Sequence, residues 1–434
     1  MALFDRRAFL ETGLGSMALA LGAGPLALSQ AAAAGAGKAG VRPDTLFLTW
    51  QRDPTTTMTV QWIGKEGEVP DTAVSFAAQG KNDWRTVAAR TTPYPMSDLK
   101  VFRTELTGLA PGTEYRFRIG RPPQLNGQPA PASGGLGDFI ASQKSTLRFR
   151  TMPAKATNDF QFVSGGDCGV NEHAVANNRI AATQDPMFAL IGGDLGYDNG
   201  RDMPTSLQFM RNYSQNMIDS QGRLIPMVVC IGNHEVNGGY SLDRNMAPFY
   251  FALHDGLYAE KSFATLDFGD YLSLVLLDSG HMAPIGGEQA DWLDKALAAR
   301  TDRAHLFAVN HVPAYPSVRL FPGTGGGNRK HWVPLFDKHN VDIVLEHHDH
   351  AFKRTHPLKD GLVDPNGILY LGDGSWGKIR APEGPDKRPY LAAASQSHHL
   401  SLHRLEGEQR FHLAIREDGK IIDVCTSKKK ARRA

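Results

Sequence analysis

Short runs of alternating apolar and polar residues fill the chain from about Pro43 to Met152. Alternation with a period of two is typical of half-buried strands, and turn-forming residues separate the runs at short intervals. Seven such strands within about 110 residues predict an all-β sandwich. The predicted strands cover residues 45–48, 58–62, 73–76, 86–87, 101–106, 115–119 and 147–150.

The pattern changes at about Asp159, where continuous apolar runs begin to alternate with helical spacing such as that of residues 287–297. Continuous runs indicate strands buried on both faces, and the intervening helices predict a layered α/β domain. Strand patterns within residues 262–277 and over the last 70 residues make the sheets mixed rather than purely parallel. The buried strands are predicted at residues 160–164, 187–191, 225–231, 304–309 and 341–345.

One string in the first region, Leu-Thr-Gly-Leu-Ala-Pro-Gly-Thr-Glu-Tyr from Leu106 to Tyr115, resembles the strand corner of fibronectin type III domains. Trp62 lies where such domains place a core tryptophan. The resemblance implies a fibronectin type III-like domain over residues 43–152, with a Pro- and Gly-rich hairpin loop at 121–137. We assign residues 159–425 to a catalytic domain and residues 426–434 to a basic tail.

The first 34 residues are predicted to be an export signal rather than part of the fold. Arg6 and Arg7 are followed by Phe9 and Leu10, a Gly/Ala/Leu-rich stretch and a run of alanines. This order resembles the bacterial twin-arginine signal, which implies a periplasmic or secreted protein. An uncleaved membrane anchor is the alternative, but the glycines and the alanine run favour cleavage and leave no stable anchor.

Composition and charge narrow the class of function. With 41% hydrophobic and 21% charged residues, the chain is neither disordered nor collagenous. Its net charge of +2 falls to −3 without the five cations of the last seven residues, which argues against nucleic acid as a partner. The three cysteines, Cys168, Cys230 and Cys425, are too few for a disulfide framework. Four histidines in strand-like sequence near the C-terminus are interpreted as ordinary surface or strand residues: His398, His399, His403 and His412.

Five polar motifs each follow one of the buried strands within a residue or two. Because the carboxyl ends of strands in an α/β sheet open onto the ligand crevice, we expect these motifs to meet. Carboxylate, phenol, amide and imidazole groups gathered there predict a metal site. The motifs are Gly166-Asp167-Cys168-Gly169, Gly193-Asp194-Leu195-Gly196-Tyr197, Gly232-Asn233-His234-Glu235, Asn310-His311-Val312-Pro313 and His347-His348-Asp349-His350.

The types of ligand indicate the metals. Seven ligating side chains are too many for one ion, so we expect two. The set has no thiolate, which favours hard or borderline ions, and the Tyr197 phenolate particularly suits Fe(III). Tyr197 follows Asp194 by three residues and can reach the same ion. In an extended segment, His348 and His350 would project to one side, where each can take a different ion.

The five motifs resemble those of the purple acid phosphatases, a branch of the calcineurin-like metallophosphoesterases, and the sandwich resembles their N-terminal domain. The resemblance implies a four-layer α/β/β/α sandwich of mixed sheets in the catalytic domain. It implies that Asp194 bridges the ions. Many other metallophosphoesterases have a histidine two residues after the first aspartate of the set. Here that position is Gly169 and Tyr197 appears instead, and this exchange selects the purple branch. The implied ligands are Asp167, Tyr197 and His350 for Fe(III), and Asn233, His311 and His348 for a divalent Zn, Mn or Fe(II).

The chain departs from the family in two places. His347 stands where the last family motif usually begins with glycine, so it either tightens the turn or adds a polar group near the ions. Plant members carry a further histidine about ten residues after the one matching His311, and the stretch 317–323 has none. Arg319 could replace it as a phosphate contact, but a surface arginine is the favoured interpretation.

The implied activity is that of an acid phosphatase acting on small phosphomonoesters. Two cations can clamp a phosphoryl group and ionise a bound water, so we predict in-line attack by a metal-bound hydroxide. His234 is expected to hydrogen-bond a phosphoryl oxygen or to protonate the leaving alkoxide, with an acidic optimum. Glu235 is expected to support the loop.

Three alternatives remain open. A phosphodiesterase can use the same metal pair, and exported alkaline phosphatases of the Fe/Ca type are related. A non-catalytic extracellular binding module, from a different class, would be expected to have lost ligands. The sandwich itself can orient substrate, join copies in a homo-oligomer or cap the catalytic domain.

Overall fold

The computed structural model describes residues 43–67, 72–120, 147–158 and 160–429. The predicted export signal at residues 1–34 and the predicted hairpin loop at 121–137 lie outside these ranges. Among the residues described, no helix is both long and apolar enough to cross a membrane.

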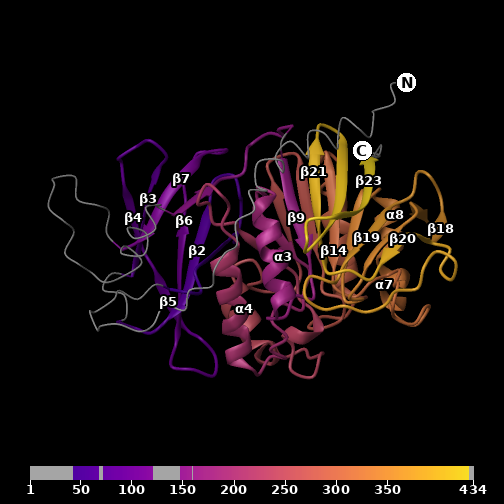
Figure 1. Cartoon of the computed structure of the whole chain (residues 1–434), viewed down its shortest axis with the longest axis horizontal. Coiled ribbons are helices and arrows are strands. Elements are labelled where there is room, and N and C mark those ends of the chain that lie inside the picture. The colour runs from indigo at the N-terminus through magenta and orange to yellow at the C-terminus, as the bar shows by residue number, and fades with distance from the viewer. Residues whose placement is uncertain (1–42, 68–71, 121–146, 159, 430–434) are drawn as a thin grey trace. The chain divides into compact units, whose positions relative to one another are not determined.

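The N-terminal region forms the predicted β-sandwich (Figure 1). Two four-stranded sheets, in the orders β1-β2-β6-β5 and β4-β3-β7-β8, contain only antiparallel pairs. All seven predicted strands are present. The strands are β1 Phe47–Thr49, β2 Met58–Gly64, β3 Ala73–Ala78, β4 Arg85–Ala88, β5 Arg90–Pro93, β6 Lys100–Leu106, β7 Glu114–Ile119 and β8 Leu147–Arg150.

The strand that the sequence does not reveal is β5, whose four residues are all exposed. An edge strand without apolar positions carries no alternation to detect.

The core of the sandwich follows the expectation more closely. Trp62 is 1% exposed and stacks on Phe102 with ring centroids 5.1 Å apart. The Ala110 amide donates to the Tyr115 hydroxyl at 2.8 Å, which closes the strand corner.

The catalytic domain contains two mixed sheets. In the first, β9, β10 and β11 are parallel, and β21, β22 and β23 continue the sheet antiparallel beyond β9. In the second, β13, β14, β15 and β19 are parallel. The strands are β9 Phe160–Gly165, β10 Ala189–Ile191, β11 Met227–Val229, β12 Ala264–Phe268, β13 Leu272–Leu276, β14 His305–Asn310, β15 Ile343–Glu346, β16 Phe352–Thr355, β17 Leu358–Lys359, β18 Leu362–Val363, β19 Leu369–Asp373, β20 Leu391–Ser395, β21 His399–Glu406, β22 Gln409–Arg416 and β23 Ile421–Lys428.

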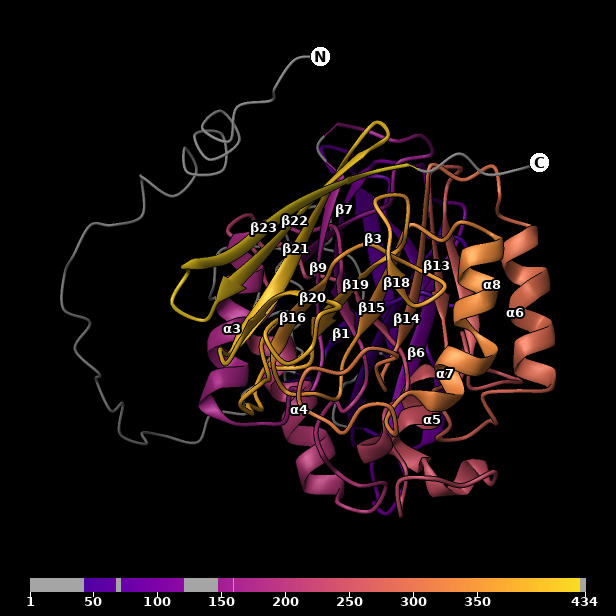
Figure 2. The same cartoon turned by 90° about the vertical axis from the view of Figure 1, so that its right-hand side faces the viewer.

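Helices cover the outer faces of the two sheets. Figure 2 shows α3 and α4 on one side of the paired sheets and α6 and α8 on the other, which is the expected four-layer order. Leu293 and Leu297 of α6, Phe336 of α8 and Trp332, just before α8, belong to the core cluster on the second sheet. The helices are α3 Glu172–Thr183, α4 Met203–Asn216, α5 Pro248–His254, α6 Glu288–Ala298, α7 Gly326–His331 and α8 Val333–Lys338, with short 3-10 turns η1 Asn233–Glu235 and η2 Arg244–Met246.

Three of the histidines interpreted as surface or strand residues lie in strands β21 and β22 and are buried between the two sheets, so the surface alternative is wrong. His399, His403 and His412 are 0%, 0% and 4% exposed. His403 Nδ1 lies 2.7 Å from His412 Nδ1, and its Nε2 lies 2.7 Å from Ser164 Oγ. The His412 Nε2 atom lies 3.2 Å from Ser427 Oγ of β23, so the buried rings of His403 and His412 hydrogen-bond to neighbouring strands.

The sandwich contacts the catalytic domain through hydrogen bonds as well as apolar packing. The Tyr94 hydroxyl donates to Ser206 Oγ at 2.8 Å, and Gln61 Nε2 donates to the Leu253 carbonyl at 3.0 Å.

At the other end of the domain, β23 runs through Lys428, which pairs with Gln409. The first residues of the predicted basic tail are therefore part of the sheet.

Candidate metal centre

The five predicted motifs meet at one edge of the paired sheets. Each begins at the last residue of a strand or within three residues after it. The strands that carry the motifs run parallel within each sheet, so their carboxyl ends lie together. Asp167 follows β9, Asp194 follows β10, Asn233 opens η1 after β11, His311 follows β14, and His348 and His350 follow β15.

Five of the seven predicted ligands have a left-handed backbone. Their φ angles are 56° for Asp167, 54° for Asp194, 68° for Tyr197, 67° for His348 and 59° for His350. Residues other than glycine rarely adopt this conformation, and it persists only where the surroundings enforce it. The segment with His348 and His350 is therefore a series of bends rather than the extended chain we expected, although the two rings do enter different groups.

The first group consists of Asp167, Tyr197 and His350. The Tyr197 hydroxyl donates to Asp167 Oδ1 at 3.1 Å and lies 2.9 Å from His350 Nε2, which lies 3.0 Å from the same carboxylate oxygen. Burial, followed by the charges of Asp167 and Asp194, raises the pKa of Tyr197 above its usual value. The phenol keeps its proton in the metal-free protein, and a cation must displace that proton to bind there.

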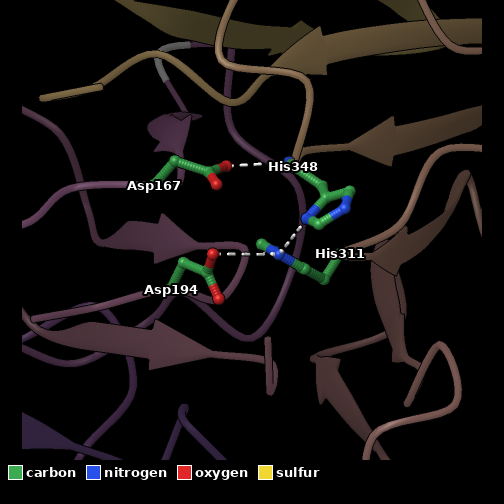
Figure 3. A group of neighbouring side chains, drawn as sticks. All are labelled: Asp167, Asp194, His311 and His348. Carbon is green, nitrogen blue, oxygen red and sulfur yellow. Dashed lines mark hydrogen bonds and ion pairs between the residues drawn. The ribbon is translucent and has the colours of Figure 1, made fainter. Parts of the chain in front are cut away.

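The second group consists of Asn233, His311 and His348, with Asp194 beside them. His311 Nε2 lies 3.2 Å from Asn233 Oδ1, 3.1 Å from His348 Nδ1 and 3.3 Å from Asp194 Oδ2. Figure 3 shows the two rings pointing toward each other beside the carboxylates. The His348 amide donates to Asp167 Oδ2 at 2.8 Å, which ties the second group to the first.

This arrangement fits a bound cation. His311 Nδ1 lies 2.9 Å from the Gly192 carbonyl, so this nitrogen carries the proton of the neutral ring. The lone pair of Nε2 then faces the acceptor oxygens of Asn233 and Asp194. Asp194 Oδ2 is buried and has no hydrogen-bond partner among the described residues. One ligand atom each from Asp167, Asp194, His311 and His348 lies within 4.8 Å of the others.

The electrostatics agree with the geometry. Although burial opposes a charge on its ring, the carboxylates of Asp194 and Asp167 raise the pKa of His311 to about 9. Burial likewise opposes ionisation of Asp194, but His311 and His234 keep the pKa of that carboxyl below its usual range. The site attracts positive charge, which a proton supplies when no metal is bound.

His234 stands beside the ligands, with its side chain 34% exposed and its Nε2 atom 3.9 Å from Asp194 Oδ2. Its Nδ1 atom hydrogen-bonds Asn199 Oδ1, and the Asn199 amide donates to the His234 carbonyl at 2.8 Å. Sequence reasoning missed Asn199. A polar residue two positions after Tyr197 was the only signal for it.

Glu235 supports the loop, as expected. Its buried carboxylate accepts from the amides of Gly232 at 2.7 Å, Asp194 at 2.8 Å and Leu195 at 2.7 Å. These bonds hold the β10 and β11 motifs together.

His347 fills the space beneath the site. It is 1% exposed, and its Nδ1 atom lies 3.0 Å from the Asn310 carbonyl. A Cβ atom on Gly192 would lie 1.9 Å from the ring and one on Gly166 would lie 2.8 Å from it. The two glycines therefore make room for the histidine that departs from the family pattern.

Arg319 is not the surface residue we favoured. It is half-buried, and its Nε and Nη2 atoms donate to the His348 carbonyl at 3.2 and 2.9 Å. Lys378, which the sequence did not single out, places Nζ 4.4 Å from the centre of the Tyr197 ring.

Comparisons with known proteins agree with this architecture. Residues 43–133 match the family described as Purple acid Phosphatase, N-terminal domain, and residues 152–352 match the Calcineurin-like phosphoesterase family. An uncharacterized protein of Mycobacterium tuberculosis is 28% identical over 401 residues, covering 82% of this chain and 72% of that protein.

Two purple acid phosphatases are also similar. Purple acid phosphatase 21 of Arabidopsis thaliana is 24% identical over 308 residues, which cover 66% of this chain and 62% of the plant protein. A purple acid phosphatase from seeds of yellow lupin (Lupinus luteus) has the same fold, with a TM-score of 0.70, 17% identity, and coverage of 88% of this chain and 74% of that one. The chain thus contains a purple acid phosphatase N-terminal domain followed by a calcineurin-like phosphoesterase domain.

Proposed function

We propose that this protein is an acid phosphatase that hydrolyses small phosphomonoesters at a pair of metal ions. The observation that carries the proposal is the division of the ligand atoms into two adjoining groups, with Asp194 beside the second. A single structural ion would need only one such group.

The first group, with its phenol, suits Fe(III), and the second suits a divalent Zn, Mn or Fe(II). When bound, the ions would neutralise charge on the phosphoryl group and lower the pKa of a water molecule at the site. No protein nucleophile is then required. The residues of the chain position the ions and manage the proton of the leaving group.

His234 is placed to manage that proton. Its Nε2 atom faces the site while Asn199 holds Nδ1, so the protonated ring can donate from Nε2 to a phosphoryl or leaving-group oxygen. Burial lowers the pKa of His234 below its usual value. Because the protonated ring is the donor, activity is expected at acidic rather than alkaline pH.

The first test is a visible spectrum with metal analysis of the purified full chain, together with a Tyr197→Phe variant. A broad visible band in the wild type, two metals per chain, and loss of the band in the variant would support a tyrosine-bound Fe(III). Two metals without a band would contradict the ferric assignment, and a metal-free, inactive protein would contradict the whole proposal.

Substrate class needs a separate measurement. Rates with p-nitrophenyl phosphate and bis(p-nitrophenyl) phosphate compare a monoester with a diester of the same leaving group. We expect the monoester to react faster, and faster hydrolysis of the diester would favour the phosphodiesterase alternative.

We further propose that the protein is exported by the twin-arginine pathway to the periplasm or the medium. The support is the Arg6-Arg7 pair ahead of the apolar stretch. Replacing both arginines by lysine should retain the protein inside the cell, as fractionation would show. Normal export of this variant would contradict the proposed route.

A further inference from the structure

Three cationic residues are anchored to the backbone of the metal-ligand motifs. The Arg319 guanidinium donates to the His348 carbonyl, the Lys378 amide donates to the Asp167 carbonyl at 3.1 Å, and the Arg380 amide donates to the His350 carbonyl at 2.7 Å. We call these three residues the cationic rim. The Lys378 Nζ atom also lies 4.4 Å from the centre of the Tyr197 ring, so the charged groups of Arg319 and Lys378 both lie beside predicted ligands.

The rim has little compensation from carboxylates. Among the side chains that the structure describes, neither Arg319, Lys378 nor Arg380 forms an ion pair with an acidic residue. The charges of Asp349, Asp167 and Asp194 act on Arg319, but none of these residues forms an ion pair with it. Asp349 accepts from the backbone amides of Val318 at 2.9 Å and Arg319 at 3.3 Å. It fixes the loop rather than covering the guanidinium.

Two of the rim charges repel each other. Arg319 is half-buried, Arg380 is exposed, and the two charges lie close enough to interact. Like charges brought close together are unfavourable unless an anion lies between them. The guanidinium of Arg319 uses two of its N–H-bearing nitrogens on His348 and retains Nη1 for another acceptor.

The rim is not needed to balance the ligands. Two carboxylates and one phenolate carry three negative charges, and one trivalent and one divalent ion would exceed them. A single phosphoryl group bound at the ions already restores the balance. The rim cations are therefore available to a further negative charge.

We propose that Arg319, Lys378 and Arg380 bind a second phosphate group of the substrate, so that the enzyme favours esters bearing two phosphates over esters bearing one. This proposal rests on the proposed phosphatase function and deepens it. Guanidinium groups bind phosphate through paired, charge-assisted hydrogen bonds, and lysine adds a point charge. The second phosphate stays intact while the first is hydrolysed at the metals.

The kinetic test compares kcat/KM for fructose 1,6-bisphosphate with that for fructose 6-phosphate, using the metal-loaded full chain. We expect the wild type to prefer the bisphosphate by about tenfold, the equivalent of one charge-assisted contact. Arg319→Gln and Lys378→Gln should each remove most of this preference, and Arg319→Lys should restore part of it. Lys359→Gln, the same change at an exposed residue of β17, should keep the preference of the wild type.

A binding measurement separates recognition from turnover. By calorimetry, methylenediphosphonate should bind more tightly than methylphosphonate to the wild type, and the difference should shrink in Arg319→Gln. Equal kcat/KM for the two sugars would overturn the rim proposal while leaving the phosphatase function intact. Equal losses on both substrates in the variants, without rescue by lysine, would show that the rim only supports the ligands and would also overturn it. Failure to hydrolyse either sugar or p-nitrophenyl phosphate would instead reject the proposed function.

Discussion

His234 Nδ1 faces the side-chain oxygen of Asn199, and this contact determines which ring nitrogen is available for chemistry. The orientation of the amide is set at its other end, where Nδ2 donates to the Tyr197 carbonyl at 3.1 Å. An amide oxygen only accepts, so Nδ1 carries a proton in both ring states. The proton that His234 gains and loses is therefore the one on Nε2.

Removing the Asn199 side chain should misorient His234 without disturbing the ligands. We expect Asn199→Ala to lower kcat about tenfold with little change in KM, because general acid catalysis depends on alignment. Steady-state kinetics and metal analysis would check this. A drop in bound metal in parallel with kcat would mean that Asn199 supports the metal site instead.

The pH dependence of kcat should report His234. Burial places its pKa below about 6.5, so the protonated donor is lost as the pH rises through that lower value and kcat falls. His234→Asn should flatten this limb of the profile. Asn199→Asp should move the limb to higher pH, since a carboxylate beside the ring favours its charged form. A limb that stays in place in both variants would assign it to another group.

Removal of the metals should destabilise the fold. The ligands extend from β9 to β15, so bound ions link segments of both sheets, and binding to the folded state alone stabilises it by mass action. We expect chelation to lower the melting temperature by several degrees, a loss of about 2 kcal/mol or more. Differential scanning calorimetry with and without chelator would measure it, and an unchanged melting temperature would contradict it.

His254 should make the domain contact sensitive to acid. It is 4% exposed, lies edge-on to Phe47 of the sandwich, and is held neutral by burial and then by the charge of Arg103, which lower its pKa to about 3. The unfolded chain binds its proton near pH 6.5, so stability falls as the pH drops below that value and levels off near the folded pKa.

Between pH 6.5 and 5 this single group should lower the free energy of unfolding by about 2 kcal/mol. His254→Gln cannot titrate and should show a shallower decline in urea denaturation. His356→Gln, at an exposed histidine, serves as the control. Parallel curves for wild type and His254→Gln would show that other groups govern the acid response.

The sequence predicted which residues gather at the strand ends better than it predicted their surroundings. Asp167 and His311 could be found because each follows a buried strand, and strand ends in such sheets converge. Arg319 and Asn199 could not be placed, because their partners, His348 and His234, are distant in sequence and no spacing rule links them. The bends at His348 and His350 were missed because strain of this kind follows from the surrounding fold.

Burial of polar residues was the other gap. His403 and His412 were interpreted as surface or strand residues, because a histidine in a strand is as compatible with solvent as with a core. Their burial depends on each other and on Ser164, three residues brought together only when β9, β21 and β22 pair. By contrast, the places of Trp62 and Tyr115 in the sandwich were predicted correctly, because a large aromatic ring in an alternating strand is most stable on the buried face.

The ligands span residues 167 to 350, and neither group is complete within any one segment of the chain. During synthesis, the last histidine of the first group emerges long after its aspartate, and the groups form only when both sheets have assembled. Under the proposed function, the metals are therefore selected late in the folding of the chain. The ions present where the chain finishes folding, rather than the affinities of isolated motifs, would decide which metals it carries.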